Sequence, residues 1–237
     1  MVKKELSAHV QAVQNPGDNM AKKASPKKKV TKKPVAPAPV PKSSLRRGTV
    51  EWYEDLFKKM KYDTGKEPQI ATHAKIILKG LVRYNALEKQ TGVPAELIGA
   101  IHMMEGSCDF RAYLGNGEKI VGTGRKSAIV PKGRGPFKTF EAGALDALKL
   151  LGLLDVKKWS LGLTLQYAEK FNGLGYLLYH PEDNSPYIWA CTNMNDGKGK
   201  YVADGQYDKH ASTDAQVGVA AMFKWLNDQN HITVNLA

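Results

Sequence analysis

The stretch from Pro94 to Glu118 constrains most strongly what this chain can fold into. In its first half, Ile98 and Ile101 follow helical spacing, and the same row continues to Glu105. Its second half is rich in glycine and contains an Asn-Gly dipeptide, which favours a tight turn between strands. The stretch therefore predicts a helix that ends in a carboxylate, followed by a short β-hairpin that carries a second carboxylate, Glu118.

Helical patterns also occur before and after this stretch. Thr49, Thr139 and Ser160 stand where helix N-caps are expected. The predicted helices cover residues 49–62, 70–90, 94–105, 140–151, 161–171, 186–193 and 215–227, the last capped by Ser212 or Thr213. Helical spacing is absent from residues 110–135, interpreted as the hairpin with a mobile loop, and from residues 194–209, interpreted as a loop. These patterns predict a mainly α (α+β) fold with one small β-hairpin.

Residues 1–47 differ in composition from the rest of the chain. They contain six of the twelve prolines and 12 Lys and Arg against two acidic residues, whereas residues 48–237 carry 23 Lys and Arg against 21 acidic residues. Such a segment buries too little apolar surface to offset its ordering entropy, so we expect a disordered basic tail followed by one domain over residues 48–237. Two interpretations of the tail stand: an electrostatic tether to anionic cell-envelope polymers, or a solubilising leader. It lacks interleaved aromatic residues, so we expect no specific nucleic-acid partner.

Cysteine, histidine and hydropathy patterns bear on the compartment and on cofactors. Two cysteines, Cys108 and Cys191, are too few for a disulfide framework, so we expect free thiols; a single bridge between them is the alternative. No apolar segment follows the opening lysines and no apolar run approaches 18 residues, so we expect neither a secretory signal nor a membrane span. The six histidines have no metal-ligand spacing, and we expect no metal and no cofactor.

The position of Glu105 suggests acid chemistry. It lies on the apolar row and in the last turn of its helix, where both burial and the helix dipole disfavour the ionised form and raise the pKa. A carboxyl that stays protonated near neutral pH is suited to protonate a glycosidic oxygen. The alternative is a boundary glutamate that reaches water or pairs with a lysine. Glu118, after the tight turn, is expected to be exposed and ionised, either as a base or charge stabiliser or as a plain solvated charge.

Several motifs together resemble those of a known family. In chain order over residues 94–222 they are IHMMEGSCDF, RAYLGNGE, PKGRGPFKTFEAGALDAL, YAEKFNGLGY, SPYIWACTN and KGKYVADGQYD. This series is similar to phage and bacterial lysozyme-like proteins, which are related to goose-type lysozymes and lytic transglycosylases. The resemblance implies a lysozyme-like fold that cleaves the β-1,4 bond between N-acetylmuramic acid and N-acetylglucosamine in peptidoglycan.

The resemblance also assigns roles to particular residues. Glu105 matches the catalytic acid of the family, and Glu118 falls where relatives carry an acidic residue, usually aspartate. The candidate substrate-binding residues are Ser107, Asn172, Tyr176, Tyr187 and Asn193. Two positions depart from the pattern: Gly106 follows the acid where transglycosylases usually have serine, and Phe171 lacks the hydroxyl of the usual tyrosine. Ser107 and Tyr176 are the candidates to replace those two hydroxyls.

These observations predict a monomeric muramidase that acts on peptidoglycan strands. Three alternatives remain open: a lytic transglycosylase that uses Glu105 alone, a chitosanase-like enzyme that acts on deacetylated glycan, and a non-catalytic module that binds the cell wall. Because no signal peptide is evident, we expect synthesis in the cytoplasm and action at the cell wall or in the periplasm.

Overall fold

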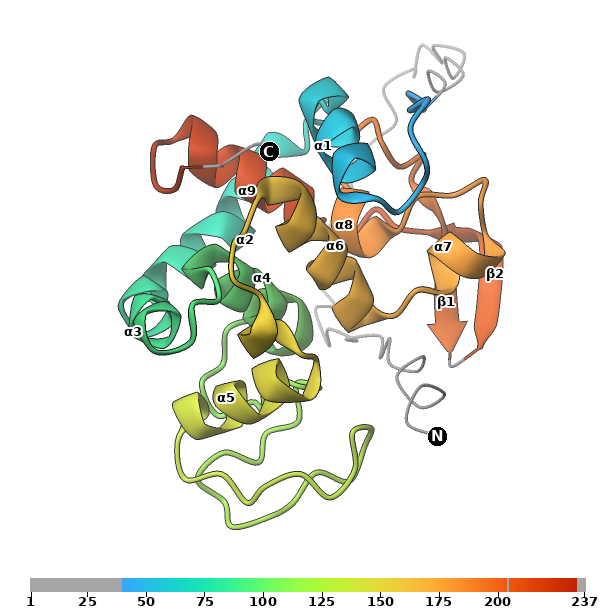
Figure 1. The fold of residues 1–237 in the computed structure, drawn as a ribbon. Coiled ribbons are helices and arrows are strands. Elements are labelled where there is room, and N and C mark those ends of the chain that lie inside the picture. The colour runs from blue at the N-terminus through green and yellow to red at the C-terminus, as the bar shows by residue number, and fades with distance from the viewer. Residues whose placement is uncertain (1–39, 204, 234–237) are drawn as a thin grey trace, which may run out of the picture.

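The computed structural model describes residues 40–203 and 205–233 (Figure 1). Most of the predicted tail therefore lies outside the described residues. The described part is mainly helical, with one two-stranded antiparallel sheet. Its elements are α1 (Val50–Lys59), α2 (Glu67–Lys79), α3 (Leu81–Thr91), α4 (Ala95–Gly106), α5 (Phe140–Leu150), a 3-10 turn η1 (Leu153–Asp155), α6 (Leu161–Asn172), α7 (Gly175–Tyr179), α8 (Pro186–Trp189), β1 (Lys198–Ala203), β2 (Gln206–Ser212) and α9 (Val219–Asp228).

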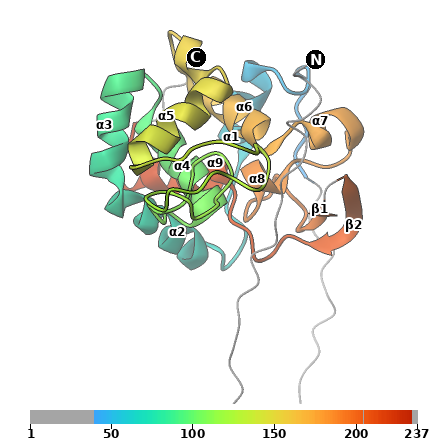
Figure 2. The ribbon, with the colours of Figure 1, turned by 90° about the horizontal axis from the view of Figure 1, so that it is seen from below.

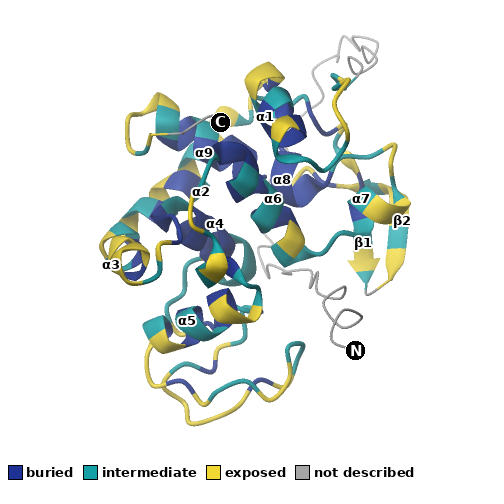
Figure 3. Cartoon of the chain, viewed as in Figure 1, coloured by how far each residue is buried: buried dark blue, intermediate teal, exposed yellow. Residues whose placement is uncertain are grey.

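Helix α4 is the centre of the core. It packs against α2, α3, α6 and α9, and nearly all of its residues from Ala95 to Met103 are buried. Figure 3 shows it dark blue between more exposed helices. The sequence predicted one apolar row on this helix, but its buried residues are not confined to one face, because four other helices pack against it. Its C-terminal residues Met104, Glu105 and Gly106 are only half-buried, because there the helix leaves the core.

Local capping signals in the sequence are confirmed. The side chain of Thr49 accepts a hydrogen bond from the backbone N–H of Trp52 at 3.3 Å, which starts α1. Thr139 and Ser160 cap α5 and α6 in the same way. Each cap satisfies a backbone donor that the first turn of a helix leaves free.

Several predicted helices have different bounds in the structure. The helix expected over residues 186–193 ends at Trp189, and the one expected over residues 49–62 ends at Lys59. The helix expected over residues 70–90 is two helices, because the chain turns at Gly80, where a Cβ would lie 2.6 Å from the ring of Tyr84. The last helix begins at Val219 rather than directly after Thr213. The Thr213 hydroxyl donates to Asn195 Oδ1 at 2.9 Å, so a tertiary contact takes the group that was expected to cap a helix.

The predicted hairpin is in the wrong place. No strand occurs between residues 107 and 139, and the antiparallel pair is β1 and β2, within and beyond the segment expected to be a loop. The aromatic rings of Tyr201 and Tyr207 pack edge-on against Tyr176 at centroid distances of 5.3 and 5.9 Å. These contacts with Tyr176 of α7 stabilise two strands whose own sequence is polar and rich in glycine. Because the contacts join residues far apart in the chain, the local sequence could not predict the strands.

Arg47 attaches the segment before α1 to the region around α7. The guanidinium of Arg47, at the end of the predicted tail, donates to the carbonyl oxygens of Tyr176, His180, Pro181 and Asp183, and so ties this segment to α7 and the turn after it. Both cysteines are free thiols. Among the helices of the described residues, none has the length and apolar character that crossing a bilayer requires.

Candidate active site

Glu105 is the residue around which the candidate site is built. Helix α4 ends one residue later, where Ser107 adopts a left-handed conformation (φ 51°) and its N–H bonds to the Met103 carbonyl at 3.0 Å. From α8, the Tyr187 hydroxyl donates to Glu105 Oε1 at 3.1 Å. Burial raises the pKa of Glu105 from 4.5 to about 7, and the Tyr187 hydrogen bond lowers it in part. A large fraction of this carboxyl is therefore protonated at neutral pH, while its residue is still partly exposed.

The chain after α4 returns to the end of that helix. Gly117 has φ 73°, and a Cβ there would overlap the Glu105 carbonyl oxygen and lie 2.9 Å from its carbonyl carbon. A Cβ at Gly106 would lie 2.8 Å from Cβ of Ala112. Glycine is required at Gly117 both by the left-handed conformation and by this close approach of two backbones. The turn predicted at residues 116–117 thus exists and lies directly against Glu105, although it joins no strands.

Glu118 anchors a loop. Its carboxylate accepts hydrogen bonds from Ser127 Oγ at 2.9 Å, from the N–H of Ala128 at 2.9 Å and from the N–H of Ile129 at 3.4 Å. Burial alone raises the pKa of Glu118, but these hydrogen bonds outweigh it, so the pKa lies below its usual value. The expectation of an exposed carboxylate is wrong, because Glu118 is half-buried and bonded to the loop.

Asn116 was not among the sequence candidates, yet it organises the same loop. It is buried, and its Nδ2 donates to Ser127 Oγ at 2.7 Å and to the Val130 carbonyl at 3.3 Å. Its Oδ1 accepts from the N–H of Glu118 at 3.0 Å. The Asn-Gly dipeptide indicated a turn, but nothing in the sequence indicated that the asparagine side chain would be enclosed.

The structure brings together only some of the remaining candidates. Tyr187 contacts Glu105, and Ser107 is an exposed helix-ending residue two positions away. Asn172 is the half-buried last residue of α6. Tyr176 is buried against the hairpin and donates to the Gly199 carbonyl at 3.4 Å. Asn193 holds Lys61 by two hydrogen bonds, from the Lys61 N–H to its Oδ1 at 2.8 Å and from its own N–H to the Lys61 carbonyl at 3.0 Å, so its contacts here are structural.

Trp189, in the same short helix as Tyr187, is a core residue. It is completely buried, and its ring stacks on Tyr53 with a centroid distance of 6.4 Å.

His102, one turn before Glu105, is also buried. Its Nε2 lies 3.0 Å from the Asp109 carbonyl and its Nδ1 lies 2.8 Å from the Tyr84 hydroxyl, and burial lowers its pKa to about 4. Its contacts fix the end of α4.

Glu169 is a second glutamate with a raised pKa, and sequence reasoning missed it. It belongs to α6 and accepts a hydrogen bond from the Tyr53 hydroxyl at 2.5 Å. Burial raises its pKa to about 7, while the Tyr53 hydrogen bond and the positive charge of Arg47 lower it in part. Its spacing of four residues from Leu165, on the buried face of α6, is the signal that would have identified it.

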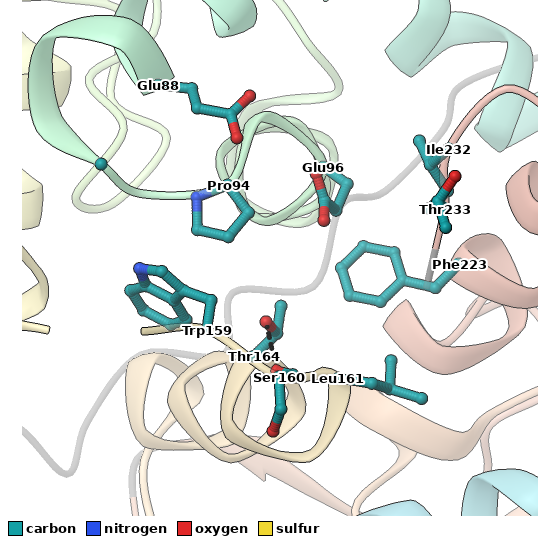
Figure 4. Close-up of a pocket in the computed structure, with 11 residues that line it drawn as sticks. Glu88, Pro94, Glu96, Trp159, Ser160, Leu161, Thr164, Phe223, Ile232 and Thr233 are labelled. Atoms are coloured by element: carbon teal, nitrogen blue, oxygen red, sulfur yellow. Dashed lines mark hydrogen bonds between the residues drawn. The ribbon is translucent and has the colours of Figure 1, made fainter. Parts of the chain in front are cut away.

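A pocket of about 160 Å³ lies at the opposite end of α4 from Glu105 (Figure 4). Its wall includes the side chains of Glu88, Glu96 and Trp159. Burial raises the pKa of Glu96, and the negative charge of Glu88 adds to this shift. Glu105 lies nine positions after Glu96 along the helix, about 14 Å at the usual rise per residue, so this pocket is not part of the Glu105 site.

Within the described residues, no group of three or more His, Cys, Asp or Glu side chains is placed to hold a metal ion.

Comparison of the chain with protein-family models, with curated proteins and with solved structures found no match. A function for this protein therefore depends on the geometry around Glu105 and on the resemblance of its motifs.

Proposed function

We propose that the protein is a peptidoglycan-cleaving glycosidase of the muramidase type, in which Glu105 is the general acid. The observation that carries the proposal is the combination at Glu105 of a pKa raised to about 7, partial exposure and a hydrogen bond from Tyr187. A general acid is most effective when its pKa lies near the working pH and when the substrate can reach it. The raised pKa of Glu105 meets the first condition, the partial exposure of the residue supports the second, and the resemblance of the motifs indicates the substrate.

In the proposed reaction, the protonated Glu105 donates its proton to the oxygen between two sugars as the bond from that oxygen to the anomeric carbon breaks. The leaving sugar departs with a new hydroxyl, and positive charge develops on the other ring. A nucleophile then adds to the anomeric carbon and gives its proton to the Glu105 carboxylate, which restores the acid. In a muramidase the nucleophile is water, and the product has a reducing end.

The surroundings of Glu118 favour a second candidate, a lytic transglycosylase. Its carboxylate already accepts hydrogen bonds from Ser127, Ala128 and Ile129, which restricts its capacity to orient a water molecule. A transglycosylase needs no second carboxylate, because the C6 hydroxyl of the muramic acid attacks its own anomeric carbon. The product is then a 1,6-anhydro sugar and water is not consumed.

Product analysis tests both candidates. Purified protein is incubated with peptidoglycan, and the soluble fragments are separated and weighed by mass spectrometry. Reducing ends support the muramidase, and fragments lighter by one water support the transglycosylase. If the wild-type protein releases no fragments from either acetylated or deacetylated glycan but sediments with the wall, a non-catalytic binding module replaces both.

A further inference from the structure

Residues 119–138 form a concentrated positive surface, named here the basic loop. They contain six Lys and Arg and no acidic residue, in a domain that as a whole carries 23 Lys and Arg against 21 acidic residues. The six are Lys119, Arg125, Lys126, Lys132, Arg134 and Lys138. Figure 3 shows much of this segment exposed, below α5.

Only part of this charge is neutralised by the protein itself. Lys119 pairs with Asp109 at 3.1 Å, and Arg134 pairs with Asp146. Lys126, Lys132 and Lys138 are exposed, and none has an ion pair with another described residue. These three ammonium groups are free to bind an anionic partner.

Backbone hydrogen bonds hold the two limbs of the basic loop side by side. The N–H of Gly122 bonds to the Phe137 carbonyl at 2.8 Å, and the N–H of Ser127 bonds to the Arg134 carbonyl at 2.9 Å. Near the tip, the N–H of Gly133 bonds to the Ser127 carbonyl at 2.8 Å. Lys126 and Lys132 therefore directly precede residues that are bonded to each other, which keeps their positive charges in one region.

The anchor of the basic loop connects it to Glu105. Glu118 binds the loop through Ser127 and Ala128, and the preceding residue, Gly117, lies against the Glu105 carbonyl. In Figure 2 the loop crosses in front of α4. The basic loop is therefore anchored to the turn that lies against Glu105.

We propose that the basic loop binds the carboxylates of the peptide stems attached to the glycan strand. This inference rests on the function proposed above, since it assigns the strand at Glu105 to peptidoglycan. The stems are covalently joined to the strand that Glu105 would cleave and carry free carboxylates, so their position and charge both match the loop. Opposite charges of this kind raise the rate and strength of association and are weakened by salt.

Binding is measured in the Glu105→Gln variant, which keeps the strands uncut. Its affinity is compared for phosphopolymer-free peptidoglycan and for the same strands stripped of their stems by an amidase. We expect stem-bearing strands to bind more tightly at low salt. Changing Lys126, Lys132 and Lys138 together to Gln should reduce the ratio of the two affinities by about tenfold. The matched control changes Lys79, Lys89 and Lys157, exposed lysines outside the loop, to Gln and should keep the original ratio.

Walls that retain their phosphate polymers are tested in parallel. Three outcomes would overturn the inference: equal affinity for both kinds of strand, an equal fall of the ratio in the control variant, or a loss of binding seen only on the walls that carry phosphate polymers. The proposed function is tested separately by cleavage with wild-type protein. If neither substrate is cut while the stem preference and its loss persist, the catalytic proposal fails and the basic loop remains a stem-binding surface.

Discussion

Glu105 and Glu169 have similar partners but different access to solvent. Each accepts a hydrogen bond from a tyrosine, at 3.1 Å from Tyr187 and at 2.5 Å from Tyr53, and burial raises each pKa to about 7. Glu169 is only 1% exposed, and its second oxygen has no hydrogen-bond partner among the described residues. Glu105 lies where α4 leaves the core and is partly exposed. A raised pKa is thus not sufficient evidence for a catalytic acid, and exposure to solvent is what distinguishes the two glutamates.

The largest expected difference between the two glutamates is in catalysis. Glu105→Gln removes the proposed proton donor and should reduce cleavage of peptidoglycan by about 10²–10⁴-fold. Glu169→Gln is the matched control, because the amide resembles the protonated carboxyl in shape and still accepts from Tyr53; it should retain most of the activity. Rates of fragment release from the two folded variants measure this. A similar loss in both variants would remove the distinction based on access.

The backbone contact behind Glu105 should contribute strongly to stability. Gly117→Ala places a methyl group against the Glu105 carbonyl in a left-handed conformation, and we expect a loss of about 3 kcal/mol or more in the free energy of unfolding. Gly122→Ala is the control, since Gly122 has a similar φ of 75° but no neighbouring atom within 4 Å of its Cβ position. It should cost about 1 kcal/mol. Denaturant unfolding measures both, and equal losses would show that the close approach is unimportant.

The two glutamates should contribute equally to the pH dependence of stability. Each has a folded-state pKa of about 7 against an unfolded reference of 4.5, so between these values the folded state retains a proton that the unfolded state has lost. The stabilisation is complete below pH 4.5 and is lost as the pH rises through 7, by about 3 kcal/mol for each site.

Unfolding measured from pH 4.5 to 7.5 tests this sign. Glu105→Gln and Glu169→Gln should each flatten the curve, although only the first should abolish activity. A curve that rises over this range in the wild type, with no change in either variant, would contradict the raised pKa values.

The smallest expected effects come from the two tyrosine hydroxyls. Tyr53→Phe leaves a fully buried Glu169 oxygen without a donor and should cost about 1–3 kcal/mol of stability. Tyr187→Phe should cost less, because water can replace the hydroxyl at the partly exposed Glu105. Instead it should raise the pKa of Glu105, since that hydrogen bond lowers it.

This effect is visible in the pH profile of kcat/KM. In the proposed reaction Glu105 acts in its protonated form, so activity should fall as the pH rises through about 7, and this descending limb should move to higher pH in Tyr187→Phe. Tyr53→Phe is the control and should leave the limb in place. If Tyr187→Phe leaves the limb unchanged, then Glu105 is not the group that titrates.

The sequence alone determined the features that depend on neighbouring residues. Thr49, Thr139 and Ser160 cap helices as predicted, because a cap needs only a side-chain oxygen and the backbone of the following turn. The turn at Gly117 and the position of Glu105 near the end of its helix follow from equally local patterns.

Only the tertiary structure decided the features that join distant parts of the chain. Tyr187 lies 82 positions from Glu105, and Tyr53 lies 116 positions from Glu169. No local pattern records which hydroxyl meets which carboxyl, and the strands β1 and β2 depend on packing against α7 in the same way. Because pKa shifts arise from burial and from such partners, the raised pKa of Glu105 was suggested by its position in the sequence but is set by the way distant parts of the chain pack around it.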